Sequence, residues 1–344
     1  MRITRDTLMK LARNAVAERV YRNRDIVCAY LTGSLLQEEP LLGGAADIDL
    51  VLVHNGQPEF PREIIQATGE VHLDLCHLPQ SYFNQPRKLR KDAWVGGYLC
   101  AGPLVFHDMQ HWFEYTQASV CSQYHSPENV IGRALPSAEA ARAIWFDLNA
   151  ARFENPVFNF WQYLRALEKA ANAAAMLVGL PLTERRFMLE FPSRAQELQR
   201  PGLSAGLIDL YLPTSLPGDQ RESMLTDCQS ALKLAARQAD CPSVLLTQRH
   251  TYYTGAIDAM WDDQPAAAAW ILLRVWTRAM CSLPEANPAV AVWQSALESL
   301  GINPRDMEGQ YAALDAYLDS IEETLDTWAS KNGIEPASST PSFS

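Results

Sequence analysis

Residues 31–53, LTGSLLQEEPLLGGAADIDLVLV, contain two apolar runs joined by a loop. The first run ends at Gly33 and Ser34, and the second opens with Asp47 and Asp49. Because side chains alternate between the two faces of a strand, these two aspartates are predicted to point to the same face. Adjacent carboxylates repel one another, and a fold that retains them usually places a cation between them. The stretch therefore predicts a cation site on one face of a strand.

A third carboxylate follows in a segment with strand periodicity. Residues 70–78, EVHLDLCHL, alternate between the two faces and predict a strand with Asp74 on its polar face. Asp49 and Asp74 are both flanked by apolar residues, where an acid is half buried and needs a partner. A simpler interpretation, in which the first two acids cap a strand and the Gly-Ser pair is only a turn, suits Asp47 but suits the other two poorly.

The chain has 344 residues, which favours two domains. Segments with strand and helix patterns alternate up to about residue 110, and helical patterns follow. We therefore predict an α+β fold, in which a small mixed-sheet domain over 1–120 precedes an all-α helical-bundle domain over 121–331 and a flexible tail over 332–344. The predicted strands are 25–31, 47–53 and 70–78, with a short apolar piece at 104–106. The predicted helices are 4–22, 64–68, 137–152 (capped by Ser137), 155–178 (capped by Asn155), 219–239, 264–282, 287–300 and 304–331.

Composition excludes several classes of protein. The formal net charge of −11 argues against a nonspecific nucleic-acid binder. No apolar run reaches the roughly 18 residues that a membrane-spanning helix needs, and the N-terminus lacks an apolar signal core. The seven cysteines are scattered without a C-x-x-C motif, which predicts reduced, mostly buried thiols and a cytoplasmic location. The sequence also lacks the G-x-S-x-G, P-loop and G-x-G-x-x-G motifs.

The order of Gly33-Ser34, Asp47-x-Asp49 and Asp74 resembles the nucleotidyltransferase superfamily typified by DNA polymerase beta, over roughly the first 110 residues. That family places a Gly-Ser at the end of one strand, a D-x-D on the next and a third carboxylate on a later strand. The resemblance implies that the three aspartates bind two Mg²⁺ ions and that the Gly-Ser pair binds the triphosphate of ATP. It also implies that Asp74 completes the metal site or acts as the general base.

These residue types suit that chemistry. Transfer of a nucleotidyl group requires stabilisation of charge on the phosphoryl oxygens and on the leaving pyrophosphate. Mg²⁺ prefers carboxylate and phosphate oxygens, and two such ions can activate the attacking hydroxyl and hold the leaving group. A glycine at 33 lets the backbone approach a phosphate closely, and the Ser34 hydroxyl adds a donor.

The helical pattern at 155–178 carries one polar stripe, in which Arg165, Glu168, Lys169 and Asn172 recur at helical spacing. The layout resembles bacterial aminoglycoside nucleotidyltransferases and their relatives, whose C-terminal helical domain faces the cleft. This resemblance implies that Glu168 is the base for the acceptor hydroxyl and that Lys169 or Arg165 binds the phosphates. An ordinary salt-bridged stripe explains the same residues equally well.

The sequence thus predicts a cytoplasmic Mg²⁺-dependent nucleotidyltransferase that moves a nucleoside monophosphate, AMP from ATP, to a hydroxyl of a small-molecule acceptor. Two alternatives stay open. One is an antitoxin-like or non-catalytic protein of the same fold that binds a partner protein. The other is transfer to a protein or RNA, although the acidic second half of the chain weighs against RNA.

Overall fold

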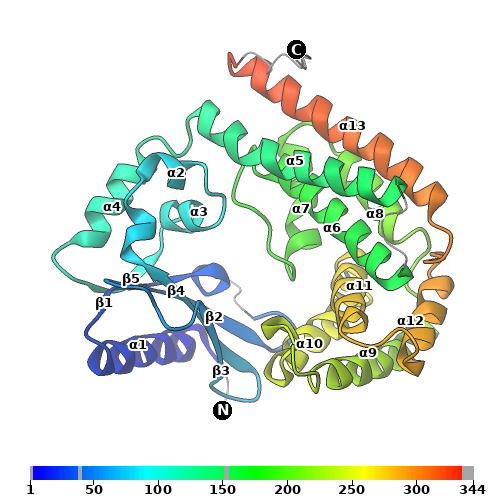
Figure 1. Cartoon of the computed structure of the whole chain (residues 1–344), viewed down its shortest axis with the longest axis horizontal. Helices are drawn as coiled ribbons and strands as arrows, with labels where there is room; N and C mark the ends of the chain where they lie inside the picture. The colour runs from blue at the N-terminus through cyan, green and yellow to red at the C-terminus, as the bar shows by residue number, and fades with distance from the viewer. Residues whose placement is uncertain (1–2, 38–40, 151–154, 335–344) are drawn as a thin grey trace.

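The computed structural model describes residues 3–37, 41–150 and 155–334. A five-stranded mixed sheet with helices on both faces forms the N-terminal part, and helices form the rest (Figure 1). The predicted α+β architecture is confirmed at this level. The predicted tail falls largely at residues 335–344, which lie outside the described residues. Among the described residues, no helix is long and apolar enough to cross a membrane.

The sheet has the strand order β3-β4-β2-β1-β5. β2 runs parallel to β4, whereas the other neighbouring pairs are antiparallel. The five strands are β1 (Ile26–Thr32), β2 (Ala46–His54), β3 (Arg62–Gln66), β4 (Val71–Pro79) and β5 (Leu104–Asp108). The three predicted strands are confirmed as β1, β2 and β4, and the predicted apolar piece at 104–106 lies in β5.

The prediction of a short helix at residues 64–68 is wrong. These residues belong largely to β3, which pairs with β4 at the edge of the sheet. The two β-branched residues Ile64 and Ile65 favour an extended backbone, and the pairing with β4 satisfies the backbone groups of this short segment.

Each face of the sheet has its own apolar core. Helix α1 (Arg5–Arg22) covers one face, where its buried residues Leu8, Ala12 and Val16 pack with apolar residues of β1 and β2. The short helices α2 (Pro86–Arg90), α3 (Val95–Cys100) and α4 (Trp112–Cys121) contribute to the core on the other face. The part of that face nearest the N-terminal end of β2 faces the helical region across a pocket.

The helical region has a single large core, which includes most of α6 and α11. Its helices are α5 (Pro127–Asn149), α6 (Pro156–Ala175), α7 (Phe187–Glu197), α8 (Gly202–Tyr211), α9 (Arg221–Ala235), α10 (His250–Met260), α11 (Pro265–Cys281), α12 (Pro288–Ser299) and α13 (Glu308–Lys331). Asn155 caps α6 as predicted, since its side chain accepts hydrogen bonds from the amides of Val157 and Phe158. Helices α7, α8 and α10 were not predicted.

The predicted start of the helix at 137 is wrong, because α5 begins at Pro127 and continues through Pro136. Ser137 lies inside the helix instead of capping it. Its hydroxyl donates a hydrogen bond to the backbone oxygen of Lys169 in α6 at 2.9 Å. The side chain therefore joins two packed helices.

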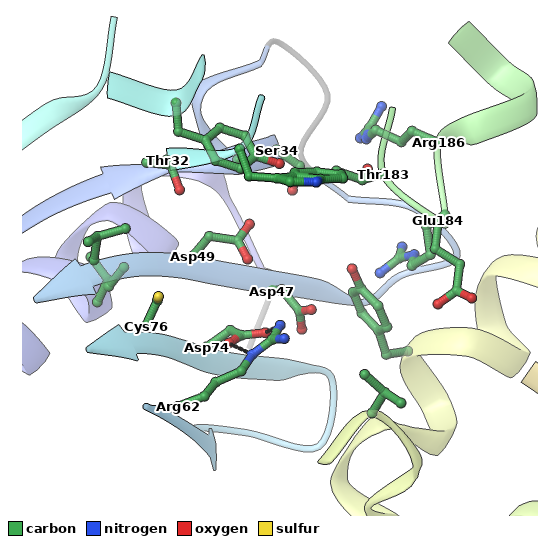
Figure 2. A pocket seen from close by; sticks show the side chains of 18 of the residues that line it. Thr32, Ser34, Asp47, Asp49, Arg62, Asp74, Cys76, Thr183, Glu184 and Arg186 are labelled. Atoms are coloured by element: carbon green, nitrogen blue, oxygen red, sulfur yellow. Dashed lines mark hydrogen bonds and ion pairs between the residues drawn. The ribbon is translucent and has the colours of Figure 1, made fainter. Parts of the chain in front are cut away.

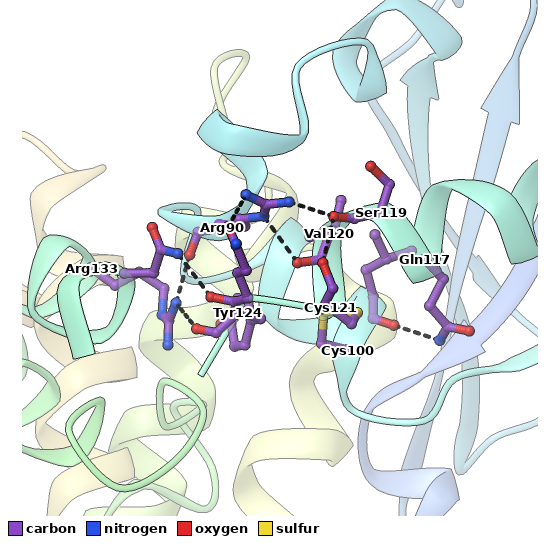
Figure 3. The surroundings of a disulfide bond; sticks show 12 residues. Arg90, Cys100, Gln117, Ser119, Val120, Cys121, Tyr124 and Arg133 are labelled. Atoms are coloured by element: carbon purple, nitrogen blue, oxygen red, sulfur yellow. Dashed lines mark hydrogen bonds between the residues drawn. A yellow bond between two sulfur atoms is a disulfide. The ribbon is translucent and has the colours of Figure 1, made fainter. Parts of the chain in front are cut away.

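The prediction of uniformly reduced cysteines is also wrong. Cys100 at the end of α3 and Cys121 at the end of α4 form a disulfide with a Cα–Cα distance of 5.4 Å (Figure 3). Their separation of 21 residues resembles no metal or redox motif, and the packing of α3 against α4 brings them together. Of the other five cysteines, only Cys28 and Cys228 are buried. The cysteine pattern therefore no longer supports a cytoplasmic location.

Candidate active site

Three carboxylates converge on the part of the sheet that faces the helical region. In the parallel pair β2–β4, Asp49 lies opposite Asp74, and Asp47 precedes Asp49 by two residues on the same face. Ligand atoms of the three aspartates all lie within 4.8 Å of one another. Figure 2 shows the three side chains extending from neighbouring strands into one pocket. The predicted convergence of these aspartates is confirmed.

Apolar residues on the opposite face of β2 fix this orientation. Ile48, Leu50 and Leu52 are buried in the core beneath α1, so the alternating residues must face away from α1. A shift of register by one residue would bury carboxylates in that core and expose the apolar residues. The hydrophobic pattern of the strand therefore determines where the aspartates point.

The Gly-Ser pair lies directly beside the carboxylates. Thr32 pairs with Asp49 across β1 and β2, and the chain then enters the one-turn 3₁₀ helix η1 (Gly33–Leu36). Gly33 has a φ of +76°, a region that favours glycine. Both Gly33 and Ser34 line the pocket, as the sequence predicted.

Two arginines that the sequence did not identify bind the carboxylates. Arg62 of β3 donates two hydrogen bonds to Asp74, from Nε to Oδ1 at 2.7 Å and from Nη2 to Oδ2 at 2.5 Å. Arg249 ends the 3₁₀ helix η5 (Thr247–Arg249) in the helical region. Its Nη2 donates to Asp47 Oδ2, and its Nη1 donates to Asp74 Oδ2 at 3.2 Å.

The carboxylates retain an unfavourable concentration of negative charge. Burial, reinforced by the charges of Asp47 and Asp74, raises the pKa of Asp49 to about 7. Burial also raises the pKa of Asp47, although Arg249 opposes this shift. His72 is fully buried 3.7 Å from Asp47 Oδ1, and burial lowers the pKa of its imidazole, which favours the neutral form. Neutral His72 does not offset the negative charge of the aspartates.

These residues fit a divalent cation. Within the described part of the chain, Asp47 Oδ1 is buried and accepts no hydrogen bond. Buried carboxylate oxygens are normally paired, and an unpaired one beside two further carboxylates is a suitable ligand for a hard cation such as Mg²⁺. Asp47, Asp49 and Asp74 together could hold such an ion.

The helical region contributes the opposite wall of the pocket, whose volume is about 500 Å³. Glu168 of α6 and Glu184, in the loop before α7, both line it. Arg274 of α11 joins the two acids, at 2.7 Å from Glu168 Oε2 and 3.1 Å from Glu184 Oε1. Burial opposes ionisation of Glu184, but Arg274 and Arg278 outweigh it and lower its pKa. Both acids are thus held beside cations.

The other two predicted residues on α6 lie elsewhere. Arg165 and Lys169 are not among the residues that line the pocket. Arg165 donates a hydrogen bond to Gln162 Oε1, one turn earlier on the same helix, at 2.9 Å. Of the predicted polar stripe, the structure brings Glu168 into the pocket together with the three aspartates.

A fixed contact joins the helical region to the sheet beside the aspartates. Arg185 donates hydrogen bonds to the backbone oxygens of Leu42 at 2.7 Å and Ala45 at 3.3 Å, in the loop before β2. Its guanidinium carbon also lies 3.6 Å from the centre of the Tyr252 ring in α10. These contacts hold α10 close to the carboxylates.

No protein-family model matches the sequence, and no curated protein matches it. Functional inference therefore depends on the pocket and its residues.

Proposed function

We propose that the protein is a Mg²⁺-dependent nucleotidyltransferase, of the DNA polymerase beta type, that transfers AMP from ATP to a hydroxyl of a small-molecule acceptor. The convergence of Asp47, Asp49 and Asp74 beside Gly33-Ser34 is the observation that carries this proposal. The pocket is large enough for a nucleotide and is lined on its far side by acidic and basic groups from the helical region.

In this proposal, Asp47 and Asp49 hold the metal, and Asp74 supports either the metal or the acceptor proton. Bound Mg²⁺ would supply Lewis-acid stabilisation of the phosphoryl and pyrophosphate oxygens. Gly33 and Ser34 contribute backbone and hydroxyl donors to the triphosphate. Arg165 and Lys169 do not line the pocket, so we assign the further phosphate contacts to Arg186, which does.

Glu168 is the proposed base for the acceptor. The acceptor oxygen attacks the α-phosphorus, and the bond from that phosphorus to the bridging oxygen of pyrophosphate breaks. The hydroxyl proton passes to Glu168, and pyrophosphate leaves with the β- and γ-phosphates. Arg274 holds one oxygen of Glu168, which orients the carboxylate toward the pocket. Glu184 keeps Arg274 paired when Glu168 takes up the proton.

To test this proposal, the purified protein is incubated with Mg²⁺, ATP and a mixture of small metabolites, and the release of pyrophosphate is measured. Mass spectrometry then searches for an acceptor that has gained one nucleoside monophosphate. Asp49→Asn should abolish both signals, whereas Asp326→Asn, on an exposed residue of α13, should leave them unchanged. Undiminished transfer by Asp49→Asn would contradict the proposed metal site.

A non-catalytic role in binding a partner protein is the second candidate. The observation that favours it is the pairing of Asp74 with both Arg62 and Arg249, which neutralises a residue that catalysis requires. Divalent-metal binding separates the two candidates. A non-catalytic protein with permanently paired aspartates would bind neither Mn²⁺ nor Mg²⁺-ATP, even at millimolar concentrations.

A further inference from the structure

Arg249 reaches the aspartates from outside the sheet. It follows Asp47 by 202 positions in the sequence and belongs to η5, immediately before α10. Its side chain is 5% exposed, and its guanidinium bridges Asp47 and Asp74. The same residue therefore neutralises part of the carboxylate cluster and links the helical region to the sheet.

Arg249 uses the oxygens that a metal ion would need. Asp47 Oδ2 and Asp74 Oδ2 both accept its hydrogen bonds. A Mg²⁺ ion binds carboxylate oxygens directly at about 2.1 Å, and a guanidinium on the same two oxygens occupies lone pairs that the ion would use and repels it through its own positive charge. Asp47 Oδ1 and the Asp49 carboxylate stay available, but they form only part of the ligand set.

The balance of charge also indicates that Arg249 and a divalent ion compete for the aspartates. Three carboxylates face the two guanidiniums of Arg62 and Arg249, which leaves one excess negative charge. A buried site with this balance gains little from a divalent ion, because the new charge would be largely uncompensated. Withdrawal of one arginine leaves two excess negative charges, which match one divalent ion.

Arg249 is better suited than Arg62 to withdraw. Arg62 belongs to β3 of the same sheet and makes two hydrogen bonds to Asp74 alone within the cluster, so its withdrawal would free no oxygen of Asp47. Arg249 instead ends η5, a single 3₁₀ turn between η4 (Ser243–Leu245) and α10, and it faces a pocket of about 500 Å³. The guanidinium can move into this pocket, where a bound triphosphate would offer a new anionic partner.

We infer that Arg249 is a displaceable counterion that competes with divalent metal for Asp47 and Asp74, so that loading of the aspartates with metal breaks the link that Arg249 makes between η5 and the sheet and leaves the contacts of Arg185 as the link that remains. This inference rests on the proposed function, since it presumes that the aspartates bind metal. It adds that metal loading is coupled to the contact between the two parts of the protein.

Hydrogen exchange of the full-length wild-type protein provides the first test. Addition of Mg²⁺ should accelerate amide exchange in residues 247–256, because these residues lose the bridge to the sheet. Exchange in α1, on the opposite face of the sheet, should not change. Slower or unaltered exchange in residues 247–256 at saturating Mg²⁺ would overturn the inference. This test needs no variant and no acceptor.

Metal affinity provides the second test. Calorimetry with Mn²⁺ should show at least tenfold tighter binding to Arg249→Met than to wild type, because the competitor is gone. Arg237→Met, on an exposed residue, controls for the loss of a positive charge elsewhere. Arg249→Lys keeps the charge but lacks the planar fork with which Arg249 contacts both carboxylates, and it should show an intermediate affinity even where Arg249→Met folds poorly.

Asp49→Asn distinguishes a failure of the proposed metal site from a failure of the proposed competition by Arg249. If neither wild type nor Arg249→Met binds Mn²⁺ in a manner that Asp49→Asn abolishes, the proposed metal site itself fails. If Mn²⁺ binds and Asp49→Asn abolishes the binding, but Arg249→Met leaves the affinity unchanged, the metal site stands and the competition by Arg249 is refuted.

Discussion

The carboxylate of Asp49 occupies the space that a side chain at position 33 would need. A Cβ atom on Gly33 would lie 2.0 Å from Asp49 Oδ2, and the backbone of Gly33 has a φ of +76°. The absence of a side chain at residue 33 thus lets the first strand end against the carboxylate. Gly33 therefore makes room for Asp49, the residue that we propose to bind the metal.

Gly33→Ala should therefore displace Asp49 and abolish Mn²⁺ binding. Gly44→Ala is the matched control, since Gly44 also has a positive φ, of +75°, but an added Cβ there meets no atom within 4 Å. The control should lose only about 1–2 kcal/mol of stability from backbone strain and should keep its metal affinity. Thermal unfolding and calorimetry with Mn²⁺ measure both effects. Equal metal affinity in the two variants would contradict the role assigned to Gly33.

The raised pKa of Asp49 predicts how the stability of the metal-free protein depends on pH. Burial, then Asp47 and Asp74, raise this pKa from 3.8 to about 7. The folded protein therefore holds the proton more tightly than the unfolded chain, so the stabilisation is complete below about pH 4 and is lost as the pH rises through about 7. Relative to Asp49→Asn, metal-free wild type should lose about 4 kcal/mol over this range.

Urea unfolding of both proteins in EDTA at several pH values tests this expectation. Above pH 7, Mg²⁺ should restore the stability of wild type but not that of Asp49→Asn, because the cation replaces the proton as the partner of the carboxylate. Parallel pH profiles of the two proteins would show that Asp49 is not the titrating group.

The aspartates could be predicted because their signal is local. Alternation along β2 and β4 is visible within a few residues, and it places Asp47, Asp49 and Asp74 on one face without any knowledge of the helical region. Gly33 and Ser34 follow from the same stretch. Strands β1, β2 and β4 were predictable for the same reason, since each carries its own apolar pattern, whereas β3 was not.

The cations around the aspartates have no such signal. Arg249 ends the single 3₁₀ turn η5, whose position depends on how the helical region packs against the sheet. Arg62 begins a short edge strand whose sequence resembled a helix. Glu184 lies in the loop before α7, where no periodicity marks it. The sequence therefore reveals the ligands of the proposed metal, whereas the charges that balance them emerge only from tertiary structure.

Glu168→Gln should lower the turnover number about 100-fold or more while leaving the affinity for Mg²⁺-ATP nearly unchanged, because a general base acts on the acceptor and not on the nucleotide. Arg274 keeps Glu184 as a partner in this variant, so the fold should persist. Glu184→Gln is the matched comparison. It removes the anion shared by Arg274 and Arg278 and should reduce stability more than turnover. A larger loss of turnover in Glu184→Gln would transfer the role of base to Glu184.

The disulfide between Cys100 and Cys121 should support one wall of the pocket, because it fixes α3, whose residues Val95 and Tyr98 line the pocket, to α4. Cross-linking residues 21 positions apart typically stabilises a protein by about 3 kcal/mol through the entropy of the unfolded chain. Cys121→Ser should lose stability of this order, and wild type in a thiol reductant should lose the same amount.

Urea unfolding of oxidised and reduced samples measures the effect, and mass spectrometry of alkylated peptides establishes which thiols are free. Cys241→Ser controls for the substitution itself, since Cys241 is outside the disulfide and only partly buried. Its unfolding midpoint should still fall on addition of reductant, as in wild type, whereas that of Cys121→Ser should not respond. Alkylation of Cys100 in the untreated wild-type protein would show that the bond does not form, and the pocket wall would then depend on apolar packing of α3 against α4 alone.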